Sequence, residues 1–193
     1  MKLYKYKSFS NFEFVADILI NNQLYASHFE ELNDPMEGDF DSSYTGGSYA
    51  KQLKESLDEV RICSLSKQKD NPILWAHYAD GFKGVCIEIE VKESSSLRKI
   101  NYTPFNPVPF DQEDSVYDWT VAILSSKYEE WEYENEYRIL HNEKYITKGF
   151  KITGIYLGAR TSDTYKILIK KLVPNNVNIY ETFVEYNQVK VKL

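Results

Sequence analysis

The sequence has few of the residues that build disulfide scaffolds and metal sites. Its 193 residues include two cysteines, Cys63 and Cys86, and three histidines. Two cysteines are too few for a disulfide scaffold or a structural zinc site. No two histidines have the i, i+4 spacing of a helical zinc motif. A zinc enzyme is therefore disfavoured, and we expect no metal cofactor.

Positive charge and long apolar segments are also scarce. The chain has 29 acidic and 23 basic residues and a net charge of −6, whereas a broad nucleic-acid surface needs a basic face. No apolar run approaches the roughly 20 residues of a membrane-spanning helix, and residues 1–6 lack a signal-peptide pattern. We expect a cytoplasmic protein without an extended nucleic-acid surface or a membrane partner.

Common nucleotide-binding and hydrolase motifs are missing. The sequence has no Gly-x-x-x-x-Gly-Lys-Ser/Thr loop, no Gly-x-Gly-x-x-Gly and no Gly-x-Ser-x-Gly, which disfavours several familiar enzyme folds. Strand and helix patterns mix without a regular βαβ rhythm or internal repeats. They predict a single α+β domain over residues 1–193, in which 159–193 adds a helix and two strands.

Apolar periodicity and capping residues predict the individual elements. Ser10 and Glu13 form a candidate capping box for a helix that ends at Asn21 and Asn22, and Asn71 and Pro72 are typical of a helix start. We expect strands at 3–7, 23–27, 62–66, 84–90, 131–140, 153–158 and twice within 178–193, further helices at 49–60, 114–128 and 162–172, and loops at 33–48 and 104–114.

The segment from Trp131 to Leu140 is the most informative. If it is a strand, Glu134, Glu136 and Arg138 share one face, because side chains alternate along a strand. Tyr133, Tyr137 and Ile139 would occupy the other face. The charged row is either one wall of a polar site or a solvated face whose charges pair with a neighbouring strand.

Two further segments carry polar side chains that suit a binding site. Asn33, Asp34 and Glu37 lie in a turn-forming stretch, where they either cap the backbone or direct carboxylates toward a cleft. Ser64 and Ser66 share one face of the predicted strand at 62–66. Their hydroxyl groups can bond a ligand or neighbouring backbone.

The predicted helix after Pro72 carries three candidate residues. Trp75 and Tyr78 are three positions apart and so share one face. His77 lies beside Ile73 and Leu74 on the face that we expect to be buried. A histidine there is either a core residue with one satisfied nitrogen or a ligand-binding group.

The order of these segments resembles a bacterial family known as domain of unknown function 2971. The resemblance covers residues 3–158 and has no settled activity attached. It rests on the following elements in order: Leu3-Tyr4-Lys5-Tyr6, Asn33-Asp34-Pro35-Met36-Glu37, Cys63-Ser64-Leu65-Ser66, Leu74-Trp75-Ala76-His77-Tyr78-Ala79, Gly81-x-x-Gly84, and Lys127-x-x-x-Trp131-x-Tyr133-Glu134-x-Glu136-Tyr137-Arg138.

A more distant resemblance is to ADP-ribosyltransferases, which bind NAD in the central cleft of a split β-sheet. It implies a mixed or antiparallel split sheet with short helices, and NAD as substrate. Tyr4 and Lys5 would lie on the first strand, Ser64 and Ser66 on the second element, and Glu134 and Glu136 would form the catalytic pair. The first strand lacks the usual His or Arg, and the serine segment lacks its middle threonine.

The resemblance also implies a mechanism. Loss of nicotinamide leaves an oxocarbenium-like ribose that a carboxylate stabilises, a role that falls to Glu136, while Glu134 orients or deprotonates the acceptor. Arg138 pairs with Glu136 or binds a phosphate, and Trp75 and Tyr78 stack on the nicotinamide or the base. Such an enzyme would be a bacterial toxin or phage-defence effector, and its acceptor stays open.

Two alternatives come from other functional classes. In the first, the protein is a non-catalytic module that binds a nucleotide or a peptide, and Glu134 and Arg138 form an internal ion pair. In the second, it is a nuclease in which Asp34, Glu37, Glu88 and Glu136 hold Mg²⁺.

Overall fold

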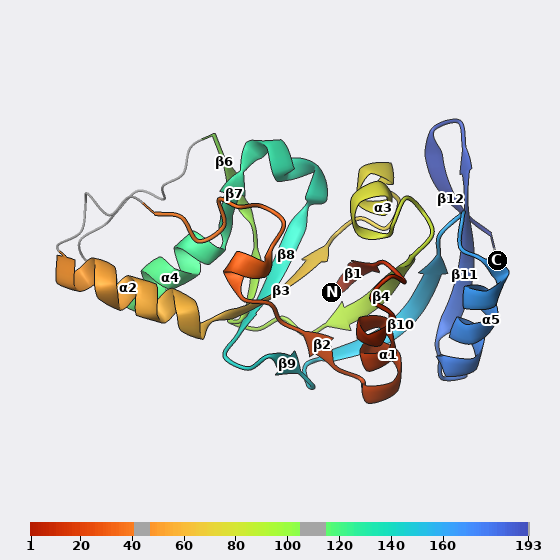
Figure 1. Ribbon diagram of the computed structural model, residues 1–193, viewed down its shortest axis with the longest axis horizontal. Coiled ribbons are helices and arrows are strands. Elements are labelled where there is room, and N and C mark those ends of the chain that lie inside the picture. The colour runs from red at the N-terminus through yellow and green to blue at the C-terminus, as the bar shows by residue number, and fades with distance from the viewer. Residues whose placement is uncertain (41–46, 105–114, 193) are drawn as a thin grey trace.

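The structure is a computed structural model that describes residues 1–40, 47–104 and 115–192. It is an α+β fold with a mixed sheet of eight strands and several short helices (Figure 1). The helices are α1 (Phe12–Asn21), η1 (Phe29–Glu31), α2 (Gly47–Glu59), α3 (Pro72–Tyr78), α4 (Val116–Leu124), η3 (Glu129–Glu134) and α5 (Asp163–Leu172). The strands are β1 (Lys2–Lys7), β2 (Leu24–Tyr25), β3 (Arg61–Ser66), β4 (Val85–Val91), β5 (Leu97–Lys99), β6 (Asn101–Thr103), β7 (Ser126–Tyr128), β8 (Glu136–His141), β9 (Tyr145–Ile146), β10 (Phe150–Leu157), β11 (Asn178–Glu185) and β12 (Gln188–Lys192).

The large sheet is nearly divided between β1 and β3. Its strand order is β12-β11-β10-β4-β1-β3-β8-β5, and only β10 and β11 run parallel. β1 pairs with β4 along all six of its residues, and β3 pairs with β8 in the same way. Between β1 and β3 a single register pair, Tyr4 with Ser66, joins the two halves. Two strands that pair at one point leave room between them for a pocket.

The core forms three groups of buried side chains. α1 and α5 pack on one face of the sheet, where Ile18 and Ile169 meet the aliphatic residues of β4. α3 contributes Leu74 and Trp75 to a second group together with Tyr6. α2 and α4 pack together at one end of the molecule, and α5 lies at the other end beside the β11–β12 hairpin (Figure 1).

Most elements lie close to their predicted positions, and the exceptions have local causes. Asn11, not Ser10, occupies the N-cap position of α1, and the Asn11 side chain makes no cap bond. The Ser10 hydroxyl instead shares a hydrogen bond with the Ser8 hydroxyl. The helix predicted at 114–128 ends at Leu124, where the chain turns into β7. The strand predicted at 23–27 is reduced to β2, which is followed by an isolated bridge from Ser27.

The segment 131–140 differs most from its prediction. Its first part is the 3-10 helix η3, Asn135 is left-handed with φ 43°, and the strand β8 begins only at Glu136. Glu134 is therefore not on the strand. Its nearness to Glu136 and Arg138 cannot come from strand alternation.

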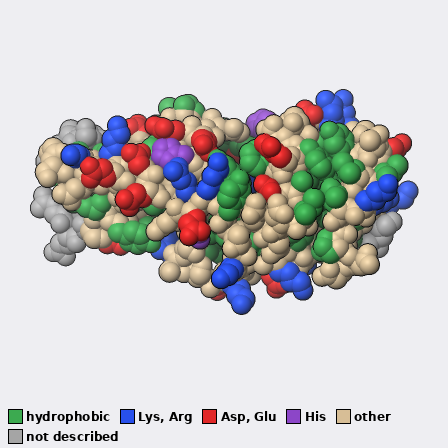
Figure 2. Space-filling model, turned by 60° about the horizontal axis from the view of Figure 1, so that its bottom comes forward, with side chains coloured by type: hydrophobic (Ala, Val, Ile, Leu, Met, Phe, Trp, Pro, Cys, Tyr) green, Lys and Arg blue, Asp and Glu red, His purple; other side chains and the backbone are tan. Residues whose placement is uncertain are grey.

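Other sequence predictions concern the surface and the loops. Most of the predicted loop 104–114 lies outside the described residues. Of the described helices, none combines the length and apolar character that crossing a bilayer requires. Acidic and basic side chains are interspersed over the face shown in Figure 2.

Candidate functional site

A pocket lies where β1 and β3 diverge. Its volume is about 230 Å³, and one wall comes from β1, another from β3 and β8, and a third from the segment around η1. The lining residues are Tyr4, Lys5, Tyr6, Lys7, Ser27, Glu31, Leu32, Asn33, Glu37, Ile62, Ser64, Leu65, Ser66, Leu74, Tyr78, Lys127, Glu134, Glu136 and Arg138. The division of the sheet thus coincides with the pocket.

Arg138 organises the buried end of this pocket. Its side chain is fully buried, and its Nε donates to Glu136 Oε1 at 2.8 Å. Nη1 donates to Glu37 Oε2 at 2.8 Å and to the Leu124 carbonyl at 2.9 Å, and Nη2 bonds both Glu37 and Glu136. A guanidinium has five N–H donors. All five are used, so Arg138 has no donor left for a phosphate and serves to hold the two glutamates.

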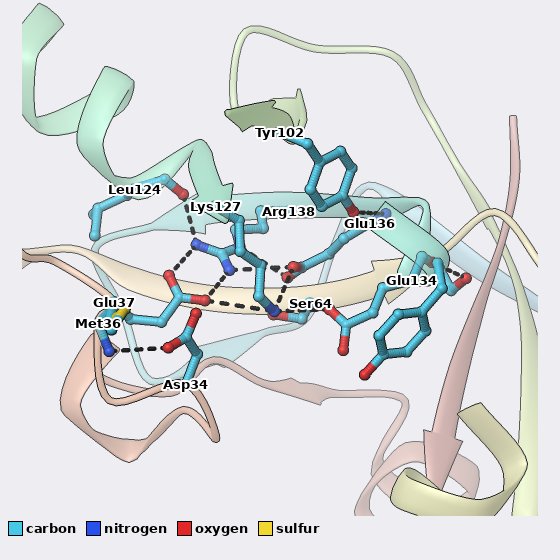
Figure 3. A network of polar contacts seen from close by, with 12 residues as sticks. Asp34, Met36, Glu37, Ser64, Tyr102, Leu124, Lys127, Glu134, Glu136 and Arg138 are labelled. Atoms are coloured by element: carbon cyan, nitrogen blue, oxygen red, sulfur yellow. Dashed lines mark hydrogen bonds and ion pairs between the residues drawn. The ribbon is translucent and has the colours of Figure 1, made fainter. Parts of the chain in front are cut away.

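Lys127 is the second buried cation. Its Nζ lies between three carboxylates, 2.7 Å from Glu134 Oε2, 3.3 Å from Glu136 Oε2 and 3.6 Å from Glu37 Oε1 (Figure 3). The ring of Trp131 lies 4.6 Å from the same Nζ. We call Glu37, Lys127, Glu134, Glu136 and Arg138 the polar cluster.

The polar cluster carries one more negative than positive group. Ionisation of a buried carboxylate is opposed by loss of hydration and favoured by nearby cations. Burial raises the pKa of Glu134 more than Lys127 and Tyr78 lower it. Burial also opposes ionisation of Glu136, but Arg138 and Lys127 outweigh it and lower its pKa to about 2. Of these two glutamates, Glu134 thus takes up a proton more readily.

The two glutamates also differ in their remaining hydrogen-bonding capacity. A carboxylate has about four acceptor positions. Glu136 accepts two bonds from Arg138 and one from Lys127. Glu134 accepts one bond from the Tyr78 hydroxyl and one from Lys127. Among the described residues, two positions of Glu134 have no partner, and they lie at the pocket.

Backbone contacts fix Glu134 and Glu136 at this position. The Ser66 hydroxyl donates to the Glu134 carbonyl at 2.6 Å, and the Glu136 amide donates to the Tyr102 hydroxyl at 2.8 Å. Burial and the nearby charge of Glu134 raise the pKa of Tyr78, and the side chain of Asn33 opposes this rise. Tyr78 therefore lies between Asn33 and Glu134.

Ten of the thirteen predicted site residues line the pocket. These are Tyr4, Lys5, Asn33, Glu37, Ser64, Ser66, Tyr78, Glu134, Glu136 and Arg138. Asp34 is buried beside the pocket but does not line it, and its Oδ1 accepts the Met36 amide at 3.0 Å. It caps the turn, as one of the two interpretations of that segment expected.

Trp75 and His77 do not have their predicted surroundings. Trp75 is 0% exposed, packs edge-on against Tyr6 and donates its indole N–H to the Lys69 carbonyl. It is a core residue and cannot stack on a ligand. His77, expected on the buried face, is exposed beside Tyr133, because Leu74 and Trp75 define the buried face of α3 instead.

The four acidic residues proposed for Mg²⁺ are not brought together. Glu37 and Glu136 are paired with Arg138, whereas Glu88 accepts hydrogen bonds from Thr153 and Tyr156 and pairs with Lys2. Within the described ranges, no three His, Cys, Asp or Glu side chains are arranged to hold a metal ion. The nuclease interpretation lacks its proposed ligand set.

Sequence reasoning missed Lys127 as a site residue. It lies in a short strand after α4, and the helix predicted through Tyr128 gave it no particular partner. The available signal was its place at the start of the segment that ends in Arg138. A cation close to a pair of glutamates is a reasonable candidate for neutralising them once both are expected to be buried.

Comparison with known families gives one match. A family model described as "Protein of unknown function (DUF2971)" matches residues 74–139. The segment is similar to that family. The resemblance stated from the motifs is confirmed over these residues, and its extension to 3–158 stays a prediction. No curated protein and no solved structure matches the chain.

The DUF2971 segment contains the main chemical groups of the site. It runs from α3 into β8 and so includes Tyr78, Lys127, Glu134, Glu136 and Arg138. Position 84 of this segment requires glycine for a steric reason, because a Cβ there would lie 2.2 Å from the carbonyl oxygen of Lys7. The matched segment thus contains most of the polar cluster and the glycine at which the turn after α3 meets β1.

Proposed function

We propose that this protein is an NAD-processing enzyme that binds the nucleotide in the pocket between β1 and β3 and breaks its nicotinamide–ribose bond. Glu134, rather than Glu136, is the catalytic carboxylate in this proposal. The observation that carries it is the contrast between them: Glu136 accepts three hydrogen bonds from the two buried cations, whereas Glu134 accepts two, only one of them from a cation, and lines the pocket with acceptor capacity to spare.

The architecture supports the choice of ligand class. The resemblance to ADP-ribosyltransferases implies a split sheet with the nucleotide in the split. The single pair between Tyr4 and Ser66, with the pocket beside it, supports this choice. Tyr4 and Tyr78 offer aromatic surface for a nicotinamide or base, and Ser64 and Ser66 are on the β3 wall.

The chemistry requires one carboxylate in two roles. The bond between C1′ and the nicotinamide nitrogen breaks with both electrons going to the nitrogen, which leaves a positive ribose. An ionised Glu134 stabilises that charge. A water molecule or an acceptor hydroxyl then adds to C1′, and its proton passes to Glu134. The raised pKa of Glu134 favours this last step.

The test is release of nicotinamide from NAD by the full chain, followed by chromatography. We expect turnover by the wild type, loss of at least about a hundredfold in Glu134→Gln, and unchanged turnover in Glu130→Gln, a matched control on the exposed side of η3. Wild-type protein that neither releases nicotinamide nor transfers ADP-ribose to protein or nucleic acid would refute the proposal.

A second candidate function is non-catalytic nucleotide binding. It is favoured by the pairing inside the polar cluster, because buried ion pairs of this kind also serve to hold a fold in place. In this case NAD raises the melting temperature of wild type and Glu134→Gln alike, and neither protein consumes it. Turnover by wild type alone excludes this candidate.

A further inference from the structure

Two lysines line the same pocket as the polar cluster but lie outside it. Lys5 and Lys7 lie on β1, two residues apart, and point to the same face of that strand. Lys5 Nζ donates to the Ser64 carbonyl at 2.7 Å across the division of the sheet. Lys7 Nζ lies 4.9 Å from the centre of the Phe14 ring. Their contacts are with a carbonyl and a ring, neither of which carries a full negative charge.

No described carboxylate neutralises this pair. Within residues 1–40, 47–104 and 115–192, no Asp or Glu oxygen lies within 4.0 Å of either Nζ, whereas Lys127 has three such neighbours. Glu31 also lines the pocket, but its carboxylate accepts the Tyr25 hydroxyl and the His28 amide. The pocket therefore has excess positive charge along β1 and excess negative charge at the polar cluster.

We propose that Lys5 and Lys7 form an anion subsite that holds the phosphate groups of the nucleotide. Tyr4 pairs with Ser66 on the face of the polar cluster, so Lys5 and Lys7 lie on the other face of β1. A ligand that passes between β1 and β3 then presents phosphate to the lysines and its ribose to Glu134. This inference rests on the proposed function for the identity of the nucleotide, but the subsite itself requires only the two lysines. It identifies Lys7, which none of the sequence motifs singled out, as a residue that contacts the ligand.

Lys7 gives the subsite a pH dependence that can be measured. Burial, followed by the neighbouring charge of Lys5, lowers its pKa to about 8, and Cys63 of β3 opposes this weakly. A bound anion favours the charged amine and so raises that pKa. Binding is therefore strongest below about pH 8 and weakens as the pH rises above it, with proton uptake on binding in this range.

The experiment is calorimetric titration of pyrophosphate into the full chain at pH 7. We expect Lys7→Met to weaken binding at least tenfold, because it removes the charge and keeps an apolar stem against Phe14. Lys7→Arg keeps the charge and is expected to bind within threefold of wild type. Lys54→Met, an exposed lysine on α2, is the charge-matched control and is expected to bind as wild type does.

A second measurement uses wild type alone and covers the case in which Lys7→Met does not fold. Acetylation of each lysine at pH 8 is followed by mass spectrometry with and without pyrophosphate, and we expect selective protection of Lys7 and Lys5. Absence of pyrophosphate binding, unchanged affinity in Lys7→Met, or equal protection of Lys54 overturns the subsite. Loss of pyrophosphate binding in Lys7→Met without any NAD turnover in wild type supports the subsite and refutes only the proposed reaction.

Discussion

Neutralising the two glutamates of the polar cluster is expected to have opposite consequences for stability and activity. Glu136→Gln and Glu134→Gln remove the same charge from positions two residues apart, and both side chains are buried. Glu136 bonds Arg138 and Lys127, whereas Glu134 bonds Lys127 and Tyr78. We expect Glu136→Gln to destabilise the fold and Glu134→Gln to leave it nearly intact.

The size of the Glu136 effect follows from its pKa. The fall from an ordinary 4.5 to about 2 corresponds to about 3 kcal/mol at roughly 1.4 kcal/mol per tenfold change in the ionisation constant. For a domain of this length that lowers the melting temperature by about 6–12 °C. The contribution is complete above pH 4.5 and is lost as the pH falls from about 4.5 to about 2. The variant and wild type should therefore converge in acid.

The pKa shift of Glu134 has the opposite sign to that of Glu136. Its pKa is raised in the folded protein, so the ionised side chain opposes folding at neutral pH, and this effect fades as the pH falls through the folded pKa. Glu134→Gln removes one charge from a cluster that has an excess negative group. A glutamine oxygen can still accept the bond from Lys127, and the glutamine amide N–H can donate to the Tyr78 hydroxyl oxygen. The free energy of unfolding should change by less than about 1 kcal/mol.

Urea denaturation at pH 7 and pH 3, together with calorimetric melting, measures both variants against wild type. The electrostatic reasoning fails if Glu134→Gln is destabilised as much as Glu136→Gln at pH 7. It fails also if the deficit of Glu136→Gln is as large at pH 3 as at pH 7.

Three further changes test other parts of the site. Tyr78→Phe removes a hydrogen bond that lowers the pKa of Glu134, so the acidic limb of the pH–rate profile of NAD turnover should move to higher pH. Arg138→Lys cannot reproduce the paired bonds to Glu37 and Glu136, and urea denaturation should show a loss of about 2–3 kcal/mol. Asn71→Ala removes the side-chain cap of α3, and its melting temperature should fall by about 2–4 °C, from roughly 1 kcal/mol. A change in the opposite direction would contradict each of these predictions.

The fold was largely predictable because local signals and burial agreed. β4 alternates aliphatic and other side chains, and Asn71 followed by Pro72 specifies a helix start. The capping box predicted at Ser10 does not form, because the hydroxyl groups of Ser8 and Ser10 lie 2.8 Å apart and hydrogen-bond each other. The order of the eight strands could not be derived from local patterns, since it depends on contacts between distant segments. The split sheet implied by the resemblance to ADP-ribosyltransferases stays a prediction.

The candidate site was predicted mainly through polar residues grouped in short segments. Such residues are informative when burial forces them to find partners, as Ser66 does with the Glu134 carbonyl. The errors at Trp75 and His77 have one cause. Helical spacing defines which residues share a face, but not which face is buried. Trp75 packs against Tyr6 in the core, and with α3 in this orientation Tyr78 lines the pocket.

The backbone at Asn135 explains why both glutamates reach the same cations. On a continuous strand, residues two apart are about 7 Å apart along one face, which is too far for Glu134 and Glu136 to meet one ammonium group comfortably. The left-handed Asn135 ends η3 and reverses the chain direction before β8 begins, so Glu134 approaches Lys127 from the helix and Glu136 from the strand. Lys127 then holds the carboxylates of Glu134 and Glu136 together. Of these two carboxylates, Arg138 bonds only that of Glu136. Unequal sharing of two cations leaves Glu134 with the raised pKa and the open acceptor positions that a catalytic carboxylate needs.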